Sequence, residues 1–136
     1  MPSVMTMIDA ANAMVALWSL DERRAMLRLM TEALAVQRAH DWIQCYTSKT
    51  TPDGVVSFCM VGACYEAALA HPYPMLHDLR LIIGAQIYPQ RMCDNDSGLA
   101  VWNDTPGRTK AEVLAAEHLA WQYLTKAVAA SELLDG

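Results

Sequence analysis

The chain has 136 residues, of which 54% are hydrophobic and 18% are charged, and its formal net charge is −5. This length predicts a single domain over residues 1–136, which can bury about two-thirds of its unfolded surface without a disulfide or a metal. The composition is too apolar for a disordered chain, and the negative charge argues against nucleic-acid binding, which requires a basic face.

The hydrophobic runs are too short to cross a membrane. The longest nearly apolar run, residues 55–70, is shorter than the roughly 20 residues that a bilayer requires, and it contains Glu66. No basic segment precedes the apolar residues at the N-terminus, so a secretory signal is not expected. We therefore expect a cytoplasmic protein that does not bind membranes.

The four cysteines, at positions 45, 59, 64 and 93, are expected to stay reduced in a cytoplasm. Cys59, Cys64, His71 and His77 follow one another in an order that suggests zinc, but their spacing matches no common zinc finger. In a helix over 59–70, the two cysteines would lie about 140° apart and could not both face one ion. We therefore predict no metal site and no cofactor.

Two helices are predicted in the N-terminal segment. Residues 8–18 form a short apolar helix, and a second helix runs over about 20–40. Ser19 and Glu22 between them match a capping box, in which the Ser19 oxygen accepts from the Glu22 backbone and the Glu22 side chain reaches back. The apolar face of the second helix is predicted to contain Met26, Leu27, Met30, Ala33 and Leu34.

A small β-hairpin is predicted over residues 42–58, where residue types that favour strands are frequent. Pro52 presets φ, Asp53 forms local hydrogen bonds and Gly54 accepts a positive φ, so that residues 51–54 predict the turn. A helix over 59–70 follows. Because it is apolar on nearly all sides, it is predicted to be the buried central helix, with Glu66 either paired or at the rim.

Residues 71–74 break this helix, and a further helix over 75–88 and a loop over 89–98 follow. The stretch AVWNDTPGRTKAEVL, residues 100–114, then predicts a turn at Pro106-Gly107 and a second capping box, with Thr109 as N-cap and Glu112 as its partner. This box starts a helix over about 110–130. The fold class is therefore mainly α: a compact helical domain of about five helices with one small β-hairpin.

The helical phase of residues 110–130 predicts a buried stripe with a charged residue inside it. The stripe contains Val113, Leu114, Ala120, Trp121, Leu124 and Val128. Glu117 falls within the stripe by angle, where it would be tolerable at a rim or an interface, and Leu119 and Tyr123 fall on the side away from it. Capping explains neither Trp102 nor Arg108; Trp102 is expected to pack over the turn or to be an exposed contact residue.

The segment WNDTPGRTKAEVL resembles the C-terminal signature of an uncharacterised family of small bacterial and bacteriophage proteins, in which Trp-Asn-Asp, Gly-Arg-Thr and Glu-Val-Leu recur in this order. The upstream segments DWIQC and CMVGACYEAA are also similar to that family. The resemblance covers about 40–128, so that 41–136 is the family-like segment and 1–40 an N-terminal helical segment. It implies no known activity. It implies a bacterial or phage origin, in which small acidic proteins often bind another protein.

Two functions follow from these observations. The favoured one is a non-catalytic protein-binding module that binds a host or defence protein in a phage context, or itself as a homodimer. Its candidate binding residues are Trp102, Arg108, Glu117, Leu119 and Tyr123. The alternative is a Cys-dependent enzyme, in which Cys59 at a helix N-terminus is the nucleophile. The base is then His77, or else His71 or His118, and Asn103 or Asp104 orients it.

Overall fold

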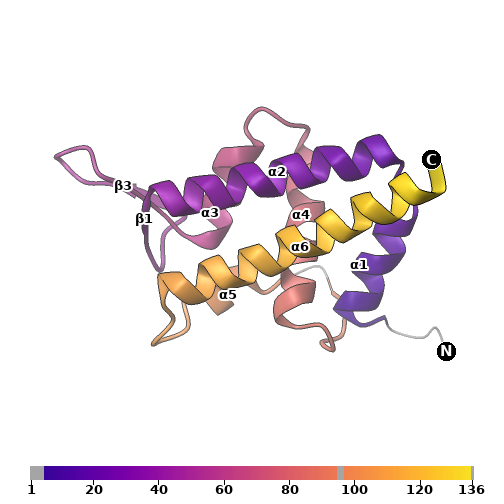
Figure 1. Ribbon diagram of the computed structural model, residues 1–136. Coiled ribbons are helices and arrows are strands. Elements are labelled where there is room, and N and C mark those ends of the chain that lie inside the picture. Colours follow the sequence, from indigo (N-terminus) through magenta and orange to yellow (C-terminus); the bar gives the residue numbers. More distant parts are fainter. Residues whose placement is uncertain (1–4, 95–96, 136) are drawn as a thin grey trace.

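The computed structural model describes residues 5–94 and 97–135, and within these ranges the chain forms six helices and three short strands (Figure 1). In chain order they are α1 (Met7–Ala16), α2 (Leu20–Ala39), β1 (Asp41–Trp42), β2 (Ser48–Thr50), β3 (Val56–Phe58), α3 (Met60–Ala68), α4 (Tyr73–Ile87), α5 (Leu99–Asn103) and α6 (Lys110–Asp135). The predicted mainly α fold with a small β element is therefore confirmed.

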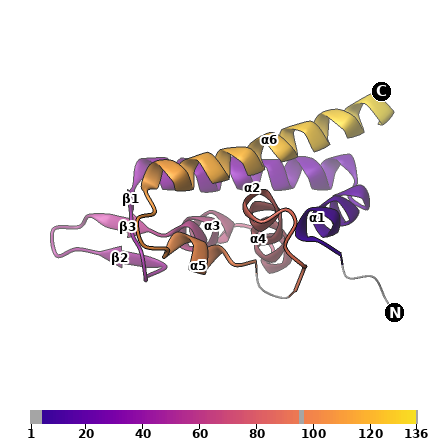
Figure 2. The same cartoon turned by 90° about the horizontal axis from the view of Figure 1, so that it is seen from below.

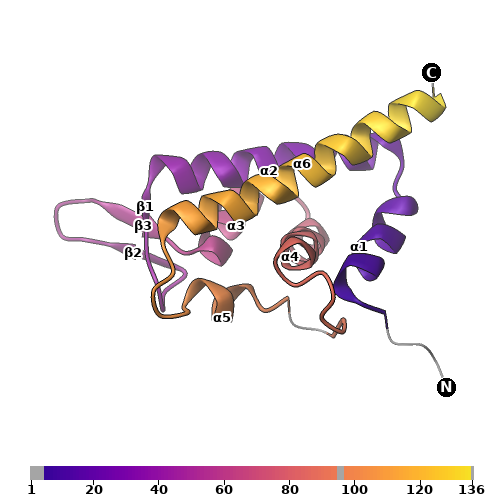
Figure 3. The ribbon, with the colours of Figure 1, turned by 60° about the horizontal axis from the view of Figure 1, so that its bottom comes forward.

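The two longest helices, α2 and α6, lie side by side and form one layer (Figures 1 and 2). Helices α3, α4 and α5 lie beneath this layer, α1 lies at one end and the small sheet lies at the other (Figure 3). Both helices of the upper layer begin at a capping box, as predicted. Glu22 and Ser19 exchange hydrogen bonds of 3.0 and 3.1 Å, and Glu112 and Thr109 exchange bonds of 3.1 and 3.2 Å.

The small sheet has the strand order β1-β3-β2. The antiparallel pair β2–β3, in which Ser48 faces Phe58 and Thr50 faces Val56, confirms the predicted hairpin over the second part of residues 42–58. The first part differs from the prediction, because Trp42 belongs to β1, which pairs with β3 in parallel. Strands β1 and β2 therefore lie on opposite sides of β3, and the loop 43–47 connects them. This loop contains Cys45, which has a positive φ of 69°.

The main core lies between α2, α3, α4 and α6, and a smaller cluster lies between α1 and α4. The prediction that the third helix is buried on nearly all sides is wrong. Its small residues, among them Ala63 and Ala67, face the core. Tyr65, Glu66 and the C-cap residue Leu69 are exposed, so that one side of the helix faces solvent.

The segment after α4 also departs from the prediction. Gly98, with φ of 72°, precedes the short helix α5, which was not predicted. The predicted loop over 89–98 is otherwise free of helix and strand where it is described, and its residues 95–96 lie outside the described residues. Gly107 adopts the positive φ, 85°, that the predicted turn at Pro106-Gly107 requires.

Candidate functional site

The side chain of Asn103, at the end of α5, is completely buried and uses all of its hydrogen-bonding groups. Its Oδ1 accepts from Trp42 Nε1 at 2.7 Å and from the Met60 backbone at 3.1 Å. Its Nδ2 donates to the Ile43 carbonyl at 3.1 Å and to Asp104 Oδ1 at 3.0 Å. Asn103 thus joins β1, the loop 43–47, α3 and α5. The amide predicted to orient a catalytic base has no group left for this role.

The rest of the Trp-Asn-Asp segment fixes the loop 43–47. Gln44 Nε2 donates to the carbonyls of Asn103 and Thr105, both at 3.0 Å, and the Cys45 backbone donates to Asp104 Oδ1 at 2.8 Å. Gly62 lets this loop approach α3, since a Cβ there would lie 1.7 Å from the carbonyl oxygen of Thr47. The polar groups of this segment are therefore used inside the fold.

Trp102 and Arg108 form a contact within the turn that precedes α6. The Arg108 guanidinium carbon lies 3.9 Å from the centre of the Trp102 ring, and Nε donates to the Trp102 carbonyl at 3.0 Å. Nη1 of Arg108 also pairs with Glu112 at 2.9 Å. Trp102 is half-buried and packs against the main core, which agrees with the expected packing over the turn.

Cys59 is the N-cap of α3, as predicted, and its Sγ accepts a hydrogen bond from the Gly62 backbone at 3.2 Å. Burial is the main influence on the thiol and raises its pKa, although the hydrogen bonds from the helix N-terminus oppose this. Cys59 lines a cavity of about 120 Å³ together with Cys45 and Asp104. His77 lines a different cavity, so the structure does not bring the two predicted catalytic residues together.

Glu117, on α6, lies in the interior of the protein and not at its rim. Its carboxyl group is completely buried, and neither oxygen has a hydrogen-bond partner among the described residues. Burial raises the pKa of Glu117 well above 4.5, and the charge of Arg38 opposes this effect only in part. The helical phase that put Glu117 in the buried stripe is confirmed, but its expected position at a rim or interface is wrong.

Leu119 and Tyr123 were expected on the side of α6 away from the core, and only Leu119 is placed there. The Leu119 side chain is 48% exposed. Tyr123 is half-buried and packs against both core clusters, and its hydroxyl donates to Asn12 Oδ1 at 2.7 Å. The expected position of Tyr123 is wrong because α1 covers that side of α6.

Sequence reasoning missed three exposed leucines, one at the junction between α1 and α2 and two in the last turn of α6, which lie at the same end of the molecule (Figures 1 and 2). Leu17 is 86% exposed, Leu133 84% and Leu134 87%. The ion pair of Arg24 with Glu132, at 3.2 Å, and the bond from Arg23 to the Ala127 carbonyl, at 2.8 Å, join α2 to this part of α6. We call Leu17, Leu133 and Leu134 the leucine end. The signal was the Leu-Leu pair, which lies beyond the predicted helix end at 130.

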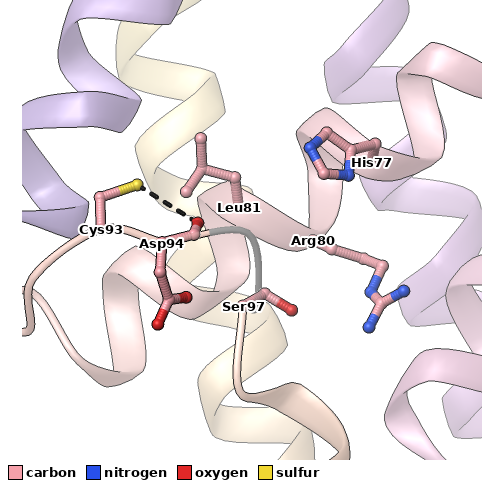
Figure 4. Close-up of a pocket in the computed structure, with 6 residues that line it drawn as sticks. All are labelled: His77, Arg80, Leu81, Cys93, Asp94 and Ser97. Atoms are coloured by element: carbon pink, nitrogen blue, oxygen red, sulfur yellow. Dashed lines mark hydrogen bonds between the residues drawn. The ribbon is translucent and has the colours of Figure 1, made fainter.

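A cavity of about 180 Å³ lies between α4 and residues that precede α5 (Figure 4). Six residues line it: His77, Arg80, Leu81, Cys93, Asp94 and Ser97. Among them, Arg80 Nε and Ser97 Oγ are buried and have no hydrogen-bond partner in the described part of the chain. This cavity therefore contains two donors that no described residue uses.

The described residues contain neither a candidate metal site nor a candidate membrane span. Within residues 5–94 and 97–135, no three His, Cys, Asp or Glu side chains are arranged to hold a metal ion. None of the described helices combines the length and the apolar character that crossing a membrane requires.

Comparison with known proteins identifies the family. No curated protein and no solved structure matches the chain significantly. A family model with the description "Family of unknown function (DUF6197)" matches residues 21–123. The match includes α2, which we expected to lie outside the family-like segment, and extends into α6. The chain therefore belongs to this family of unknown function, DUF6197.

Proposed function

We propose that the protein is a non-catalytic protein-binding module and that the leucine end is its contact surface. The observation that supports this is the exposure of three leucine side chains, each more than four-fifths accessible, at one end of the molecule. Burying one such side chain in an interface contributes about 1.5–3 kcal/mol relative to leaving it in water. Large apolar surfaces exposed on a protein often mark a protein contact.

The surroundings of the leucine end suit an interface. Arg24 and Glu132 beside it are charged and half-exposed, and charged groups of this kind typically form the polar rim around an apolar centre. Leu119, further along α6, adds a smaller apolar contact. The leucine end lies outside the matched residues 21–123. The partner we propose is another protein, in a bacterial or phage setting a host or defence protein, and a second copy of the chain is the rival partner.

The non-catalytic part of the proposal is supported by the positions of the candidate catalytic groups. Cys59 and His77 line separate cavities, and the Asn103 amide is occupied by four hydrogen bonds. The Cys59 thiol also has a raised pKa, so that little thiolate is present at neutral pH.

The leucine end is tested with the double variant Leu133→Glu/Leu134→Glu. Its matched control is Ala115→Glu/Gln122→Glu, which adds two carboxylates at exposed positions of the same helix. Light scattering measures self-association, and affinity capture from a bacterial lysate with mass spectrometry measures binding of another protein. We expect a stoichiometric complex with the original chain and with the control, and its loss in the leucine variant with an unchanged circular-dichroism spectrum. A complex that survives in the leucine variant would place the contact elsewhere.

Thiol alkylation separates the module from the Cys-dependent enzyme. Mass-spectrometric mapping of the native protein should show Cys45, which is exposed, reacting well before Cys59, which is buried. The Cys45→Ser variant shows whether Cys59 reacts when its neighbour in the cavity is absent. Reaction of Cys59 faster than that of a free thiol would favour the enzyme.

A further inference from the structure

We propose that the cavity between α4 and Ser97 binds the phosphate group of a small ligand. This site is separate from the leucine end. Its lining combines a cation, Arg80, with a buried hydroxyl, Ser97, and an imidazole, His77 (Figure 4).

Leaving the two buried donors of this cavity without hydrogen-bond partners costs free energy. Arg80 Nε and Ser97 Oγ are both buried, Ser97 is only 9% exposed, and neither atom has a hydrogen-bond partner in the described residues. An unpaired buried donor costs about 1–3 kcal/mol, and a donor on a charged group costs more. A ligand that accepts from both atoms would remove this cost.

The charge of Arg80 also favours an anionic ligand. Arg80 takes part in no ion pair within the described ranges, although it is partly buried on α4. A guanidinium group presents its donors in a planar fork that matches the oxygens of phosphate. An unpaired cation beside an unpaired hydroxyl therefore points to an anion with several oxygens.

The carboxylate in the lining does not block such a ligand. Asp94 is exposed, and its Oδ2 lies 3.5 Å from Nη2 of Arg91, which offsets its charge. Figure 4 shows the Asp94 carboxylate pointing away from Arg80, whereas the Ser97 hydroxyl points towards the side on which the Arg80 guanidinium lies. The donors thus face a common space from which the acidic group is turned away.

The position of Ser97 is set by close packing on α4. A Cβ at Gly84 would lie 2.7 Å from the Ser97 carbonyl oxygen and 3.3 Å from its Cβ, so only glycine allows the Ser97 backbone to lie directly on this helix. Arg80 lies one helical turn before Gly84, and residues four apart share a face of a helix. The two donors are therefore held by the same part of α4.

The size of the cavity restricts the ligand. A volume of about 180 Å³ accommodates a phosphate group but is smaller than the roughly 300–1,000 Å³ of pockets that enclose drug-sized molecules. The phosphate group could be a free ion or the end of a phosphomonoester whose remaining atoms extend into solvent. A free phosphate ion and a phosphomonoester would bind through the same donors, and their relative affinities for the site distinguish them.

The experiment is titration calorimetry of the whole chain with inorganic phosphate and, separately, with phosphoserine, at fixed pH and ionic strength. Arg80→Gln and Ser97→Ala each remove one donor. Arg28→Gln, at an exposed site on α2, and Ser131→Ala, at a buried site on α6, make the same chemical changes elsewhere. We expect saturable binding of at least one of the two ligands, weakened at least tenfold in both cavity variants and unchanged in both controls.

The remaining outcomes are also decisive. Tighter binding of phosphoserine than of phosphate supports the site with a phosphomonoester as its ligand, and the reverse supports a free ion. If Arg80→Gln does not fold, Ser97→Ala alone decides, since it removes a single atom. Failure of the original chain to bind either ligand, or equal affinity in Ser97→Ala and Ser131→Ala, overturns the proposal.

Discussion

Asn103 and Glu117 are polar side chains that are buried to the same extent but differ in their hydrogen bonding. Asn103 has four hydrogen bonds to groups on four segments, whereas neither oxygen of Glu117 has a partner among the described residues. A neutral amide with all of its partners can hold distant segments together. A carboxyl group without partners can remain buried only if it stays protonated, which is the direction of its pKa shift. We therefore expect Asn103 to stabilise the fold and Glu117 to destabilise it.

The largest effect is expected from Asn103→Ala. It leaves Trp42 Nε1, the Met60 N–H and the Ile43 carbonyl without their partner, and each such loss costs about 1–3 kcal/mol, so we expect a loss of about 3 kcal/mol or more. Urea denaturation measures this loss. Asn12→Ala, which removes one exposed bond to Tyr123, is the control and should cost less than about 1 kcal/mol. A small effect of Asn103→Ala would show that this region is not held by its amide.

Glu117→Met should have the opposite sign. Removing an unpartnered carboxyl group from the core and filling its space with an apolar side chain should raise the free energy of unfolding by about 2 kcal/mol at pH 8. Glu66→Met, at an exposed position on α3, is the control and should change little. A clear loss of stability would mean that the Glu117 carboxyl group has a partner in solution.

The pH dependence of stability tests the same carboxyl group. Below about pH 4.5 it is protonated in both states, so it contributes no difference. As the pH rises above this value, the unfolded chain ionises while the folded chain stays protonated, so stability falls until the pH reaches the raised pKa of the folded state. Denaturation from pH 4 to pH 9 should show this decrease in the original chain and a smaller one in Glu117→Met. Parallel curves for the two proteins would contradict the raised pKa.

Gly62→Ala tests whether the Asn103 region also depends on close packing. Its Cβ would lie 1.7 Å from the Thr47 carbonyl oxygen, so the loop 43–47 must move, and the Cys59-to-Thr47 backbone bond of 3.1 Å must lengthen. We expect a loss of about 2 kcal/mol, within the range for overpacked sites. Amide hydrogen exchange should become faster at Cys59 than at Val113 in α6. An unchanged exchange rate at Cys59 would show that the loop 43–47 can move away from α3 without destabilising the fold.

Thr109→Ala should have the smallest effect on stability. It measures the contribution of a polar group that has its hydrogen-bond partner at the surface, for comparison with the two buried groups. Losing this N-cap should cost about 1 kcal/mol, and Ser19→Ala at the other capping box should cost about the same. Partner binding should remain, because the role of Thr109 is structural. Loss of binding at unchanged stability would instead make the turn a contact site.

The helix starts could be predicted because their signals are local. Ser19 with Glu22, and Thr109 with Glu112, are three residues apart, so the sequence contains the whole capping interaction. The burial of Glu117 was also predictable, since helical phase depends only on spacing within α6. The short helix α5 was missed because Asn103 and Asp104, which usually favour turns, are held by groups from the segment 42–60.

The interactions of the Asn103 region could not be predicted. Asn103 bonds to Trp42, Ile43 and Met60, which lie 61, 60 and 43 residues away, and the sequence does not show which distant segments meet. The same limit explains Tyr123, whose angle on α6 was known but whose cover by α1 was not. The unused donors Arg80 and Ser97 are likewise recognisable only when the cavity between them is known.

The pairing of α2 with α6 has a consequence for synthesis. Arg24 and Glu132, which bridge these helices, are 108 residues apart in the chain. At about 5–20 residues per second, a ribosome needs roughly 5–20 s to proceed from the first to the second. During this interval the apolar face of α2, with Met26, Met30 and Ala33, has no α6 to cover it. We therefore expect the nascent chain to expose part of this surface until α6 has emerged, and the long-range pairing of α2 with α6 to form late in folding.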